Sequence, residues 1–308
     1  MLTEAAKGVF TISVTPVRED GSLDLDSLDR VTDFYIEQGA TGLTVLGMMG
    51  EAGKLSADEA VRVVRRVTAR TSVPVVVGVS APGFAAMHAL ANDSMNAGAA
   101  GVMVAPPSTL RTDAQIVSYY RNTTETLGRI PFVLQDFPLA TQVVISTSVI
   151  REIVRECPTC VMLKHEDWPG LDKISALRAA SDRGERRISI LCENGALYLL
   201  EEMQRGAVGA MTGFSYPEMM ARTIVRYNTG DVTGARDVFD AYLPLIRYEA
   251  QPGLGLAIRK HVLARRGAIA SPAVRKPGGL LNAAAVREVE SLIHRQAQKL
   301  RALGLEPN

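Results

Sequence analysis

Short apolar runs alternate with longer amphipathic segments along most of the chain. The run at residues 75–77 consists of three valines behind Pro74, and such continuous hydrophobicity is typical of a parallel strand buried on both faces. In the preceding segment, Ala60, Val64 and Val67 instead recur at the spacing of one helical face. The pattern therefore predicts strands that alternate with helices.

The whole set of these runs defines the expected elements. The apolar runs predict strands at residues 10–15, 42–46, 73–78, 101–105, 131–135, 161–164, 188–192 and 206–212. The amphipathic segments between them predict helices at residues 25–38, 56–71, 84–97, 113–127, 146–156, 171–181 and 197–205. Parallel strands need crossover helices of this kind, and eight such units favour a closed (β/α)8 barrel, the TIM barrel. A doubly wound open sheet is the alternative, but the first strand–helix turn has no G-x-G-x-x-G, so nothing supports dinucleotide binding.

The last part of the chain is helical. Three further helices are predicted at residues 232–248, 255–266 and 283–303, separated by turn-rich segments. We expect residues 1–230 to form the barrel as the catalytic domain, and residues 231–308 to form a C-terminal helical extension packed on it.

Composition and charge narrow the functional classes. The 308 residues are 47% hydrophobic, which suffices for a large core, and the formal net charge is +1. Because a net charge this close to zero creates no strong electrostatic attraction for polyanions, we expect neither nucleic acid nor a membrane as a partner. The chain starts without a basic segment before an apolar run, and no apolar stretch approaches the roughly 20 residues of a membrane span. We therefore expect a cytoplasmic protein.

The cysteines suggest structure rather than chemistry. Three cysteines are too few to stabilise a chain of this length by disulfide bonds, which fits a reducing compartment. Cys157 and Cys160 form a C-x-x-C pair, which is found in redox motifs and in zinc sites. No second pair completes it, and it falls in the turn that enters a predicted strand, at the end of a barrel opposite the chemistry. We interpret the pair as structural and predict no metal site.

Lys164 is the most unusual polar residue of the predicted strands. It ends the run at residues 160–164, where an apolar strand would bury its charge. Loss of hydration lowers the pKa of such a lysine, and the neutral amine becomes a nucleophile for a ketone. The alternative is a lysine in a buried ion pair, or one that snorkels from the strand end.

Two more polar residues stand at neighbouring strand ends. If the strand continues past Lys164, Glu166 faces the same side and His165 the other, because side chains alternate with a period of two. A carboxylate would then lie beside the amine; a simple salt bridge, or a loop in which the period is lost, is the alternative. Gln135 and Asp136 close the fifth strand and are expected at the rim of a pocket.

The second strand is followed by Gly47, Met48, Met49, Gly50 and Glu51. Two glycines in this string allow a tight turn whose backbone N–H groups can face a carboxylate, as in an anion nest. A plain turn explains the same string.

Taken together, these residues resemble the dihydrodipicolinate synthase / N-acetylneuraminate lyase family of Schiff-base barrels, over nearly the whole chain. The resemblance implies that Lys164 is the Schiff-base lysine and that the turn at residues 47–51 holds the substrate carboxylate. The segment 206–213 is similar to the glycine-rich eighth strand of the family, so Thr212 and Gly213 are expected to bind substrate. The resemblance further implies a homodimer or homotetramer and no cofactor.

The chain departs from the family pattern at several positions. Gln135 stands where the family has a tyrosine that relays protons, Met48 and Met49 replace two threonines, and Ala140 stands near the arginine of the synthases. The L-2-keto-3-deoxyarabonate dehydratase branch of the family is more similar. That branch shares Gln-Asp at the fifth strand, Lys-x-Glu at the sixth, the glycine-rich eighth segment, and Leu-Pro-Leu-Ile, here at residues 243–246.

The sequence therefore predicts a cofactor-free class I lyase of small 2-oxo acids that dehydrates a 2-keto-3-deoxy sugar acid. In this hypothesis Lys164 forms the imine, Glu166 moves protons, and Gln135 orients a hydroxyl group or water. Two alternatives stay open. One is a pyruvate-dependent aldolase, including dihydrodipicolinate synthase-like activity, and the other is a barrel that binds a 2-oxo acid without turnover.

Overall fold

A computed structural model describes residues 1–307, and its core is a closed barrel of parallel strands in sequence order. The strands are β1 (Gly8–Ile12), β2 (Gly42–Val45), β3 (Val75–Gly78), β4 (Gly101–Val104), β5 (Phe132–Asp136), β6 (Cys160–His165), β7 (Ser189–Cys192) and β8 (Gly209–Ala210). Because β1 also pairs with β8, through Gly8 with Gly209 and Val9 with Ala210, the sheet has no free edge. The predicted (β/α)8 barrel is confirmed and the open sheet is excluded.

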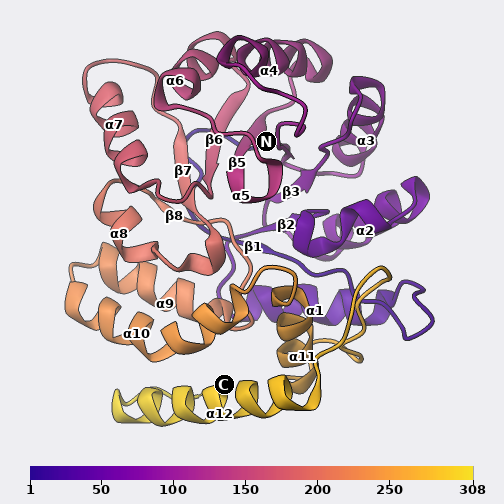
Figure 1. Ribbon diagram of the computed structural model, residues 1–308, viewed down its shortest axis with the longest axis vertical. Coiled ribbons are helices and arrows are strands. Elements are labelled where there is room, and N and C mark those ends of the chain that lie inside the picture. Colours follow the sequence, from indigo (N-terminus) through magenta and orange to yellow (C-terminus); the bar gives the residue numbers. More distant parts are fainter. Residues whose placement is uncertain (308) are drawn as a thin grey trace.

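Helices follow the strands and cover the outside of the barrel (Figure 1). The barrel helices are α1 (Leu25–Glu37), α2 (Ala57–Arg70), α3 (Phe84–Asn96), α4 (Asp113–Leu127), α5 (Pro138–Thr141), α6 (Thr147–Glu156), α7 (Leu171–Asp182), α8 (Leu199–Gln204) and α9 (Pro217–Asn228). Local sequence sets their starts. Ser56 and Glu59 form the capping box of α2, and Thr112 and Gln115 form that of α4.

The predicted elements were wrong in a few places. The first strand lies at Gly8–Ile12 rather than 10–15, and the eighth is only two residues long. The helices α5 and α9 were missed. The buried face of α9 combines Met219, Met220 and Ile224 with the polar Glu218 and Thr223, and Glu218 pairs with Arg266 at 2.8 Å.

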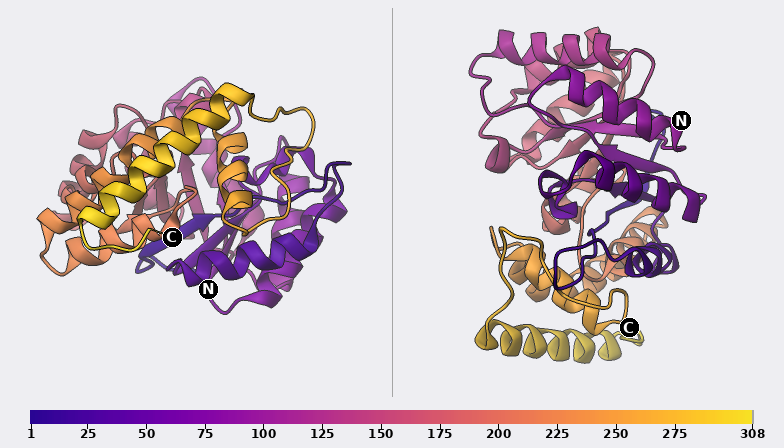
Figure 2. Two further views of the ribbon diagram at one scale, coloured as in Figure 1. Left: turned by 90° about the horizontal axis from the view of Figure 1, so that it is seen from below. Right: turned by 90° about the vertical axis from the view of Figure 1, so that its right-hand side faces the viewer.

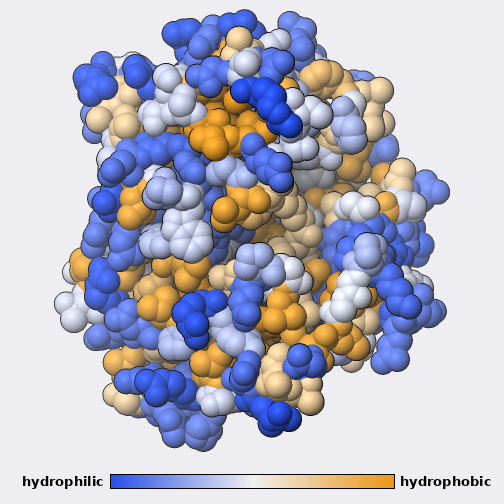
Figure 3. Space-filling view, in the orientation of Figure 1, coloured by the Kyte–Doolittle hydropathy of each residue, from blue (hydrophilic) through white to orange (hydrophobic). Residues whose placement is uncertain are grey.

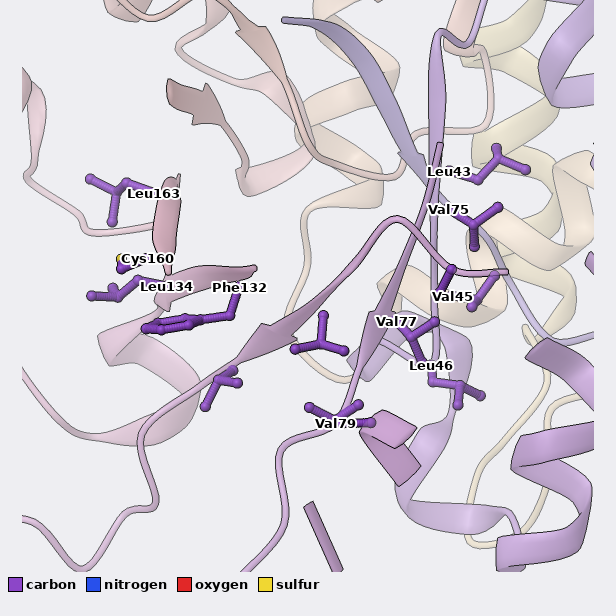
Figure 4. Close-up of a cluster of buried hydrophobic side chains, with 14 of the residues drawn as sticks. Leu43, Val45, Leu46, Val75, Val77, Val79, Phe132, Leu134, Cys160 and Leu163 are labelled. Atoms are coloured by element: carbon purple, nitrogen blue, oxygen red, sulfur yellow. The ribbon is translucent and has the colours of Figure 1, made fainter. Parts of the chain in front are cut away.

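Two hydrophobic clusters fix which way each strand faces. Outward side chains pack under the helices, among them Leu43 and Val45 of β2 and Val75 and Val77 of β3 (Figure 4). Inward side chains fill the barrel, and these are Phe10, Ile12, Val76, Met103, Val133, Val161, Met162, Leu191 and Met211. The inner cluster leaves the carboxyl ends of the strands free for polar residues, which is where active sites of TIM barrels lie.

The C-terminal helices lie together at one side of the barrel. They are α10 (Val232–Glu249), α11 (Gly255–Arg265) and α12 (Ala283–Ala302). Figures 1 and 2 show α12 as the outermost element at this end, with α10 and α11 between it and the barrel. No helix within residues 1–307 has the length and apolar character needed to cross a membrane.

Candidate active site

A β-bulge aims Lys164 into the barrel. Cys160 packs in the outer cluster, and strict alternation from it would also turn Lys164 outward. However, Phe132 of β5 pairs with Cys160 and Val133 pairs with Met162, so Val161 is an extra residue on β6. Val161 and Met162 both face inward, and the phase of the strand changes there. Bulges of this kind re-aim side chains beside active sites.

The Lys164 side chain is buried among carboxyl groups. Lys164 is 2% exposed. Its Nζ donates a hydrogen bond to Oε1 of Glu166 and lies 3.4 Å from Oε1 of Glu193. The expectation that Lys164 and Glu166 share one face is confirmed. His165 faces the outside of the barrel, where its Nδ1 lies 2.9 Å from Oε1 of Glu202 on α8.

Glu193 is the site residue that the sequence reasoning missed. It directly follows β7, whose Leu191 faces inward, so a period of two brings Glu193 inward as well. Asn194, Gly195 and Ala196 then have φ values of 52°, 66° and 67°, a left-handed stretch that is costly for residues other than glycine. This loop lets the Asn194 N–H donate to Glu193 Oε2 and the Asn194 amide donate to the Glu166 carbonyl at 3.1 Å. Continuing the strand period by two residues would have found Glu193.

The two carboxyl groups have opposite pKa shifts. Burial, and then the charge of Glu193, raise the pKa of Glu166 well above its usual value. Burial alone would also raise the pKa of Glu193, but the Lys164 charge and hydrogen bonds from Glu166 and the Asn194 N–H lower it. The opposite shifts favour Glu166 as the protonated member of the pair and Glu193 as the ionised one. One acid and one base then face the same amine.

Gln135 joins this group from β5. Its Nε2 donates to Glu166 Oε1 at 2.7 Å, and Gln135 pairs in register with Lys164. The expectation for Asp136 was wrong. As the next residue on β5, Asp136 faces outward and binds Lys173 Nζ of α7 at 2.6 Å, so it does not form the pocket rim. Burial raises the pKa of the Asp136 carboxyl in this outer position.

The turn after β2 is a short 3₁₀ segment, η1 (Met48–Gly50). Its first hydrogen bond runs from the Gly50 N–H to the Gly47 carbonyl at 3.0 Å, so the N–H groups of Met48 and Met49 have no acceptor within the turn. Thr15 Oγ1 donates to the Gly50 carbonyl at 2.6 Å and fixes the turn against the end of β1. Met48 is 48% exposed, while Met49 packs against the inner cluster.

Thr212 and Gly213 follow β8 and reach the same group of residues. Thr212 Oγ1 donates to Glu193 Oε1 at 3.2 Å and accepts from the Gly195 N–H at 3.0 Å. The Gly213 carbonyl accepts a hydrogen bond from Arg259 of α11. The structure thus brings Thr212 to the carboxyl pair and places Gly213 against the C-terminal helices.

Apolar side chains also appear on the outer surface. Figure 3 shows hydrophobic residues gathered between α4 and α5, and others spread over the lower half of the same face. Leu139 of α5 and Val144 after it are exposed large hydrophobic residues of this segment, at 62% and 69%. Both lie downstream of β5, the strand that carries Gln135.

The C-x-x-C pair is expected to be dispensable for catalysis. Cys157 ends α6 and Cys160 opens β6, both are buried free thiols, and burial raises the pKa of each. Replacing both with alanine is expected to leave kcat/KM within about three-fold, because the pair precedes β6 at the end of the barrel away from Lys164. The replacement removes small buried groups, so a modest fall in Tm is expected. Steady-state kinetics and thermal unfolding of the double variant test this, and a large loss of kcat in a folded variant would contradict it.

Comparison with known proteins shows the family of this chain. The model of the Dihydrodipicolinate synthetase family matches residues 5–296. The chain belongs to this family. Among its members, an L-2-keto-3-deoxyarabonate dehydratase from Azospirillum brasilense is 29% identical over 282 residues, which is 89% of each chain. A 4-hydroxy-tetrahydrodipicolinate synthase from Thiobacillus denitrificans is 30% identical over 251 residues, 78% of this chain and 80% of the relative.

A solved structure of the family is also similar. The crystal structure of a dihydrodipicolinate synthase from Rhodopseudomonas palustris is 54% identical, with a TM-score of 0.94, and the match covers 96% of this chain and 99% of that chain. The family resemblance drawn from the sequence is therefore confirmed. Relatives in this family include both a dehydratase and synthases, so membership alone leaves the reaction open.

Proposed function

We propose that this protein is a class I lyase that forms a Schiff base between Lys164 and a 2-oxo acid and dehydrates a 2-keto-3-deoxy sugar acid such as L-2-keto-3-deoxyarabonate. One observation carries the proposal: the buried Lys164 contacts two carboxyl groups, Glu166 and Glu193, whose pKa values are shifted in opposite directions. Such a pair supplies an acid and a base to one imine.

The first step is imine formation. Glu193, 3.4 Å from Lys164 Nζ, accepts a proton from the ammonium group, and the neutral amine attacks C2 of the keto acid. The C2 oxygen takes the proton held by Glu193 and leaves as water, so a protonated C=N bond forms and Glu193 is ionised again. The imine then acts as the electron sink. In this arrangement the N–H groups of Met48 and Met49 receive the substrate carboxylate, with Thr212 and Gly213 beside it.

Elimination follows from the imine. The ionised Glu193 removes a proton from C3, and the C–H electron pair moves toward the imine nitrogen to give an enamine. Return of this pair expels the C4 hydroxyl group, which takes the Glu166 proton and leaves as water. Gln135, bonded to Glu166 Oε1 at 2.7 Å, orients that hydroxyl group. Hydrolysis of the imine restores Lys164, and the proton that Glu193 took from C3 replaces the one that Glu166 gave up, so the net change is the loss of one water from the substrate.

A synthase reaction is the second candidate. The dihydrodipicolinate synthase from R. palustris is 54% identical to this chain. Two features favour dehydration. Gln135 cannot relay a proton as a tyrosine does, and Ala140 offers no charge for a second carboxylate.

The pH profile of kcat for the dehydration is expected to be bell-shaped. The pKa of Glu193 is lowered, so catalysis is lost as the pH falls through this value and the base becomes protonated. The pKa of Glu166 is raised, so catalysis is lost as the pH rises through that value and the acid is deprotonated. In the Glu166→Gln variant the alkaline limb is expected to disappear from the residual activity. An unchanged alkaline limb in that variant would contradict the assignment of Glu166 as the acid.

A substrate panel tests the reaction itself. Purified protein is incubated with 2-keto-3-deoxy acids, or with pyruvate and aspartate semialdehyde, while products are followed by mass spectrometry. Dehydration predicts a product that is one water lighter than the keto-deoxy acid and no free pyruvate. Release of pyruvate and an aldehyde would show an aldolase, and condensation with the semialdehyde would show a synthase.

A further inference from the structure

Two adjacent cations on α11 are buried and take no part in the proposed chemistry. Arg259 is 5% exposed and Lys260 is fully buried. Charged residues are almost never buried to this degree unless they are paired. Their partners lie on two different loops that follow barrel strands, so each cation ties the C-terminal helices to one loop.

Lys260 reaches the turn after β2. Its Nζ contacts Oε2 of Glu51 and donates to the Ala273 carbonyl at 2.9 Å. The other carboxylate oxygen of Glu51 accepts from Lys54 Nζ at 3.0 Å and from the Arg275 N–H at 2.9 Å. Both oxygens of this buried carboxylate are therefore held, one of them by α11.

Arg259 reaches the loop after β8. Its Nε donates to Glu249 Oε1 at 2.6 Å, and its Nη2 donates to the Gly213 carbonyl. Glu249 in turn accepts from the Ser215 N–H at 3.2 Å. A Cβ atom at Gly213 would lie 1.9 Å from Nη1 of Arg259, so the guanidinium occupies the space where a side chain would stand. This explains why position 213 requires glycine.

The turn after β2 needs such support, because its backbone is strained at both ends. Leu46 and Glu51, which flank the segment 47–50, have φ values of 56° and 57°. A leucine in the left-handed region is a genuine outlier, and such conformations persist only where surrounding contacts impose them. The contacts of Glu51 with Lys260, Lys54 and Arg275 are of this kind.

We propose that Arg259 and Lys260 are positioning residues, through which α11 holds the two loops that receive the substrate carboxylate. Lys260 holds the turn at residues 47–50 through Glu51, and Arg259 holds the segment 212–215 through Gly213 and Glu249. The assignment of these loops to substrate binding rests on the proposed function. The role of α11 in fixing their shape rests on the contacts alone.

Lys260→Met and Arg259→Met are the test variants, and Arg178→Met is the matched control. Arg178 is also a buried cation, 6% exposed, and it donates to the carbonyls of Ile188 and Gly206 at 2.7 and 2.9 Å. These residues precede β7 and β8, so Arg178 lies at the opposite end of the barrel. If Lys260→Met does not fold, Glu51→Gln/Lys260→Met removes both charges and keeps an acceptor for the Arg275 N–H.

Amide hydrogen exchange reports how firmly the two loops are held, and it does not depend on catalytic activity. Lys260→Met is expected to speed amide exchange in peptides that cover residues 46–54 and not in those that cover 212–216, whereas Arg259→Met is expected to do the reverse. Arg178→Met is expected to change neither segment beyond a uniform effect. Exchange that rises equally everywhere in all three variants would overturn the proposal, since it would show general destabilisation.

Imine trapping measures the consequence for binding. In Lys260→Met, the pyruvate concentration that gives half-maximal borohydride trapping is expected to rise about 10- to 100-fold. A displacement of the loop by about 1 Å has an effect of this size. The amount of protein trapped at saturating pyruvate is expected to stay unchanged. An unchanged half-saturation in a variant whose loop does exchange faster would overturn the link to carboxylate binding. If the unaltered protein traps no 2-oxo acid at all, the proposed function fails, while the exchange result still decides the role of α11.

Discussion

Lys164→Met is expected to abolish turnover, with a fall in kcat of at least about 10⁴-fold, the scale found when a covalent nucleophile is removed. Methionine is similar in length and has no amine, so no imine can form. The substitution also removes the cation between Glu166 and Glu193. We expect both carboxyl groups to become protonated at higher pH than in the unaltered protein, because the Lys164 charge lowers the pKa of each.

The measurement is kcat on the best substrate of the panel, beside circular dichroism and Tm. A folded Lys164→Met variant that retains a tenth or more of the original kcat would contradict the Schiff-base mechanism. Exposed Lys299 on α12 offers a control, since Lys299→Met is expected to leave kcat unchanged.

Glu166→Gln is expected to separate imine formation from elimination. The amide keeps the shape of the side chain and can still accept a hydrogen bond from Lys164, but it has no proton to give to the C4 hydroxyl group. General acid–base groups typically contribute about 10² to 10⁴ in rate, so kcat is expected to fall by a factor in this range. Borohydride trapping of the pyruvate imine is expected to persist.

Glu193→Gln and Gln135→Tyr sharpen this experiment. Glu193→Gln removes the base near C3 and is expected to lose turnover on the same scale, whereas Gln135→Tyr is expected not to raise the rate of elimination. Near-normal turnover by Glu166→Gln would show that the acid is assigned wrongly. Turnover lost together with all imine trapping would show that Glu166 serves the first step instead.

The fold followed from the sequence because its pattern is regular. Each β/α unit repeats an apolar run and an amphipathic helix, and strand order in a barrel is the order of the sequence. The prediction of helices from the sequence was less successful where a buried helix face contains polar residues. The buried face of α9 contains Glu218, whose partner Arg266 is far away in sequence, and no local period shows such a pair.

The candidate site was predictable in part, for the same reason. Lys164 and Glu166 are two residues apart, so the period of a strand predicted that both lie on one face. The bulge at Val161 turns that face toward the inside of the barrel, and no pattern in the local sequence indicates this bulge. Asp136 was misplaced at the rim because only the pairing of Gln135 with Lys164 shows which of the two residues faces inward. Glu193 comes from another strand, and only the closed barrel brings it within 3.4 Å of Lys164 Nζ. The buried link from Lys260 on α11 to Glu51 spans 209 positions and could not be seen in the sequence.

Borohydride trapping with peptide mapping shows whether Lys164 forms the imine. The protein is incubated with pyruvate or a 2-keto-3-deoxy acid, reduced, digested and examined by mass spectrometry. One added keto acid, joined through a reduced C–N bond, is expected on the peptide that contains Lys164, and none on that peptide in Lys164→Met. Label on Lys54, Lys173 or Lys260 instead, or no label with any 2-oxo acid that the protein turns over, would contradict it.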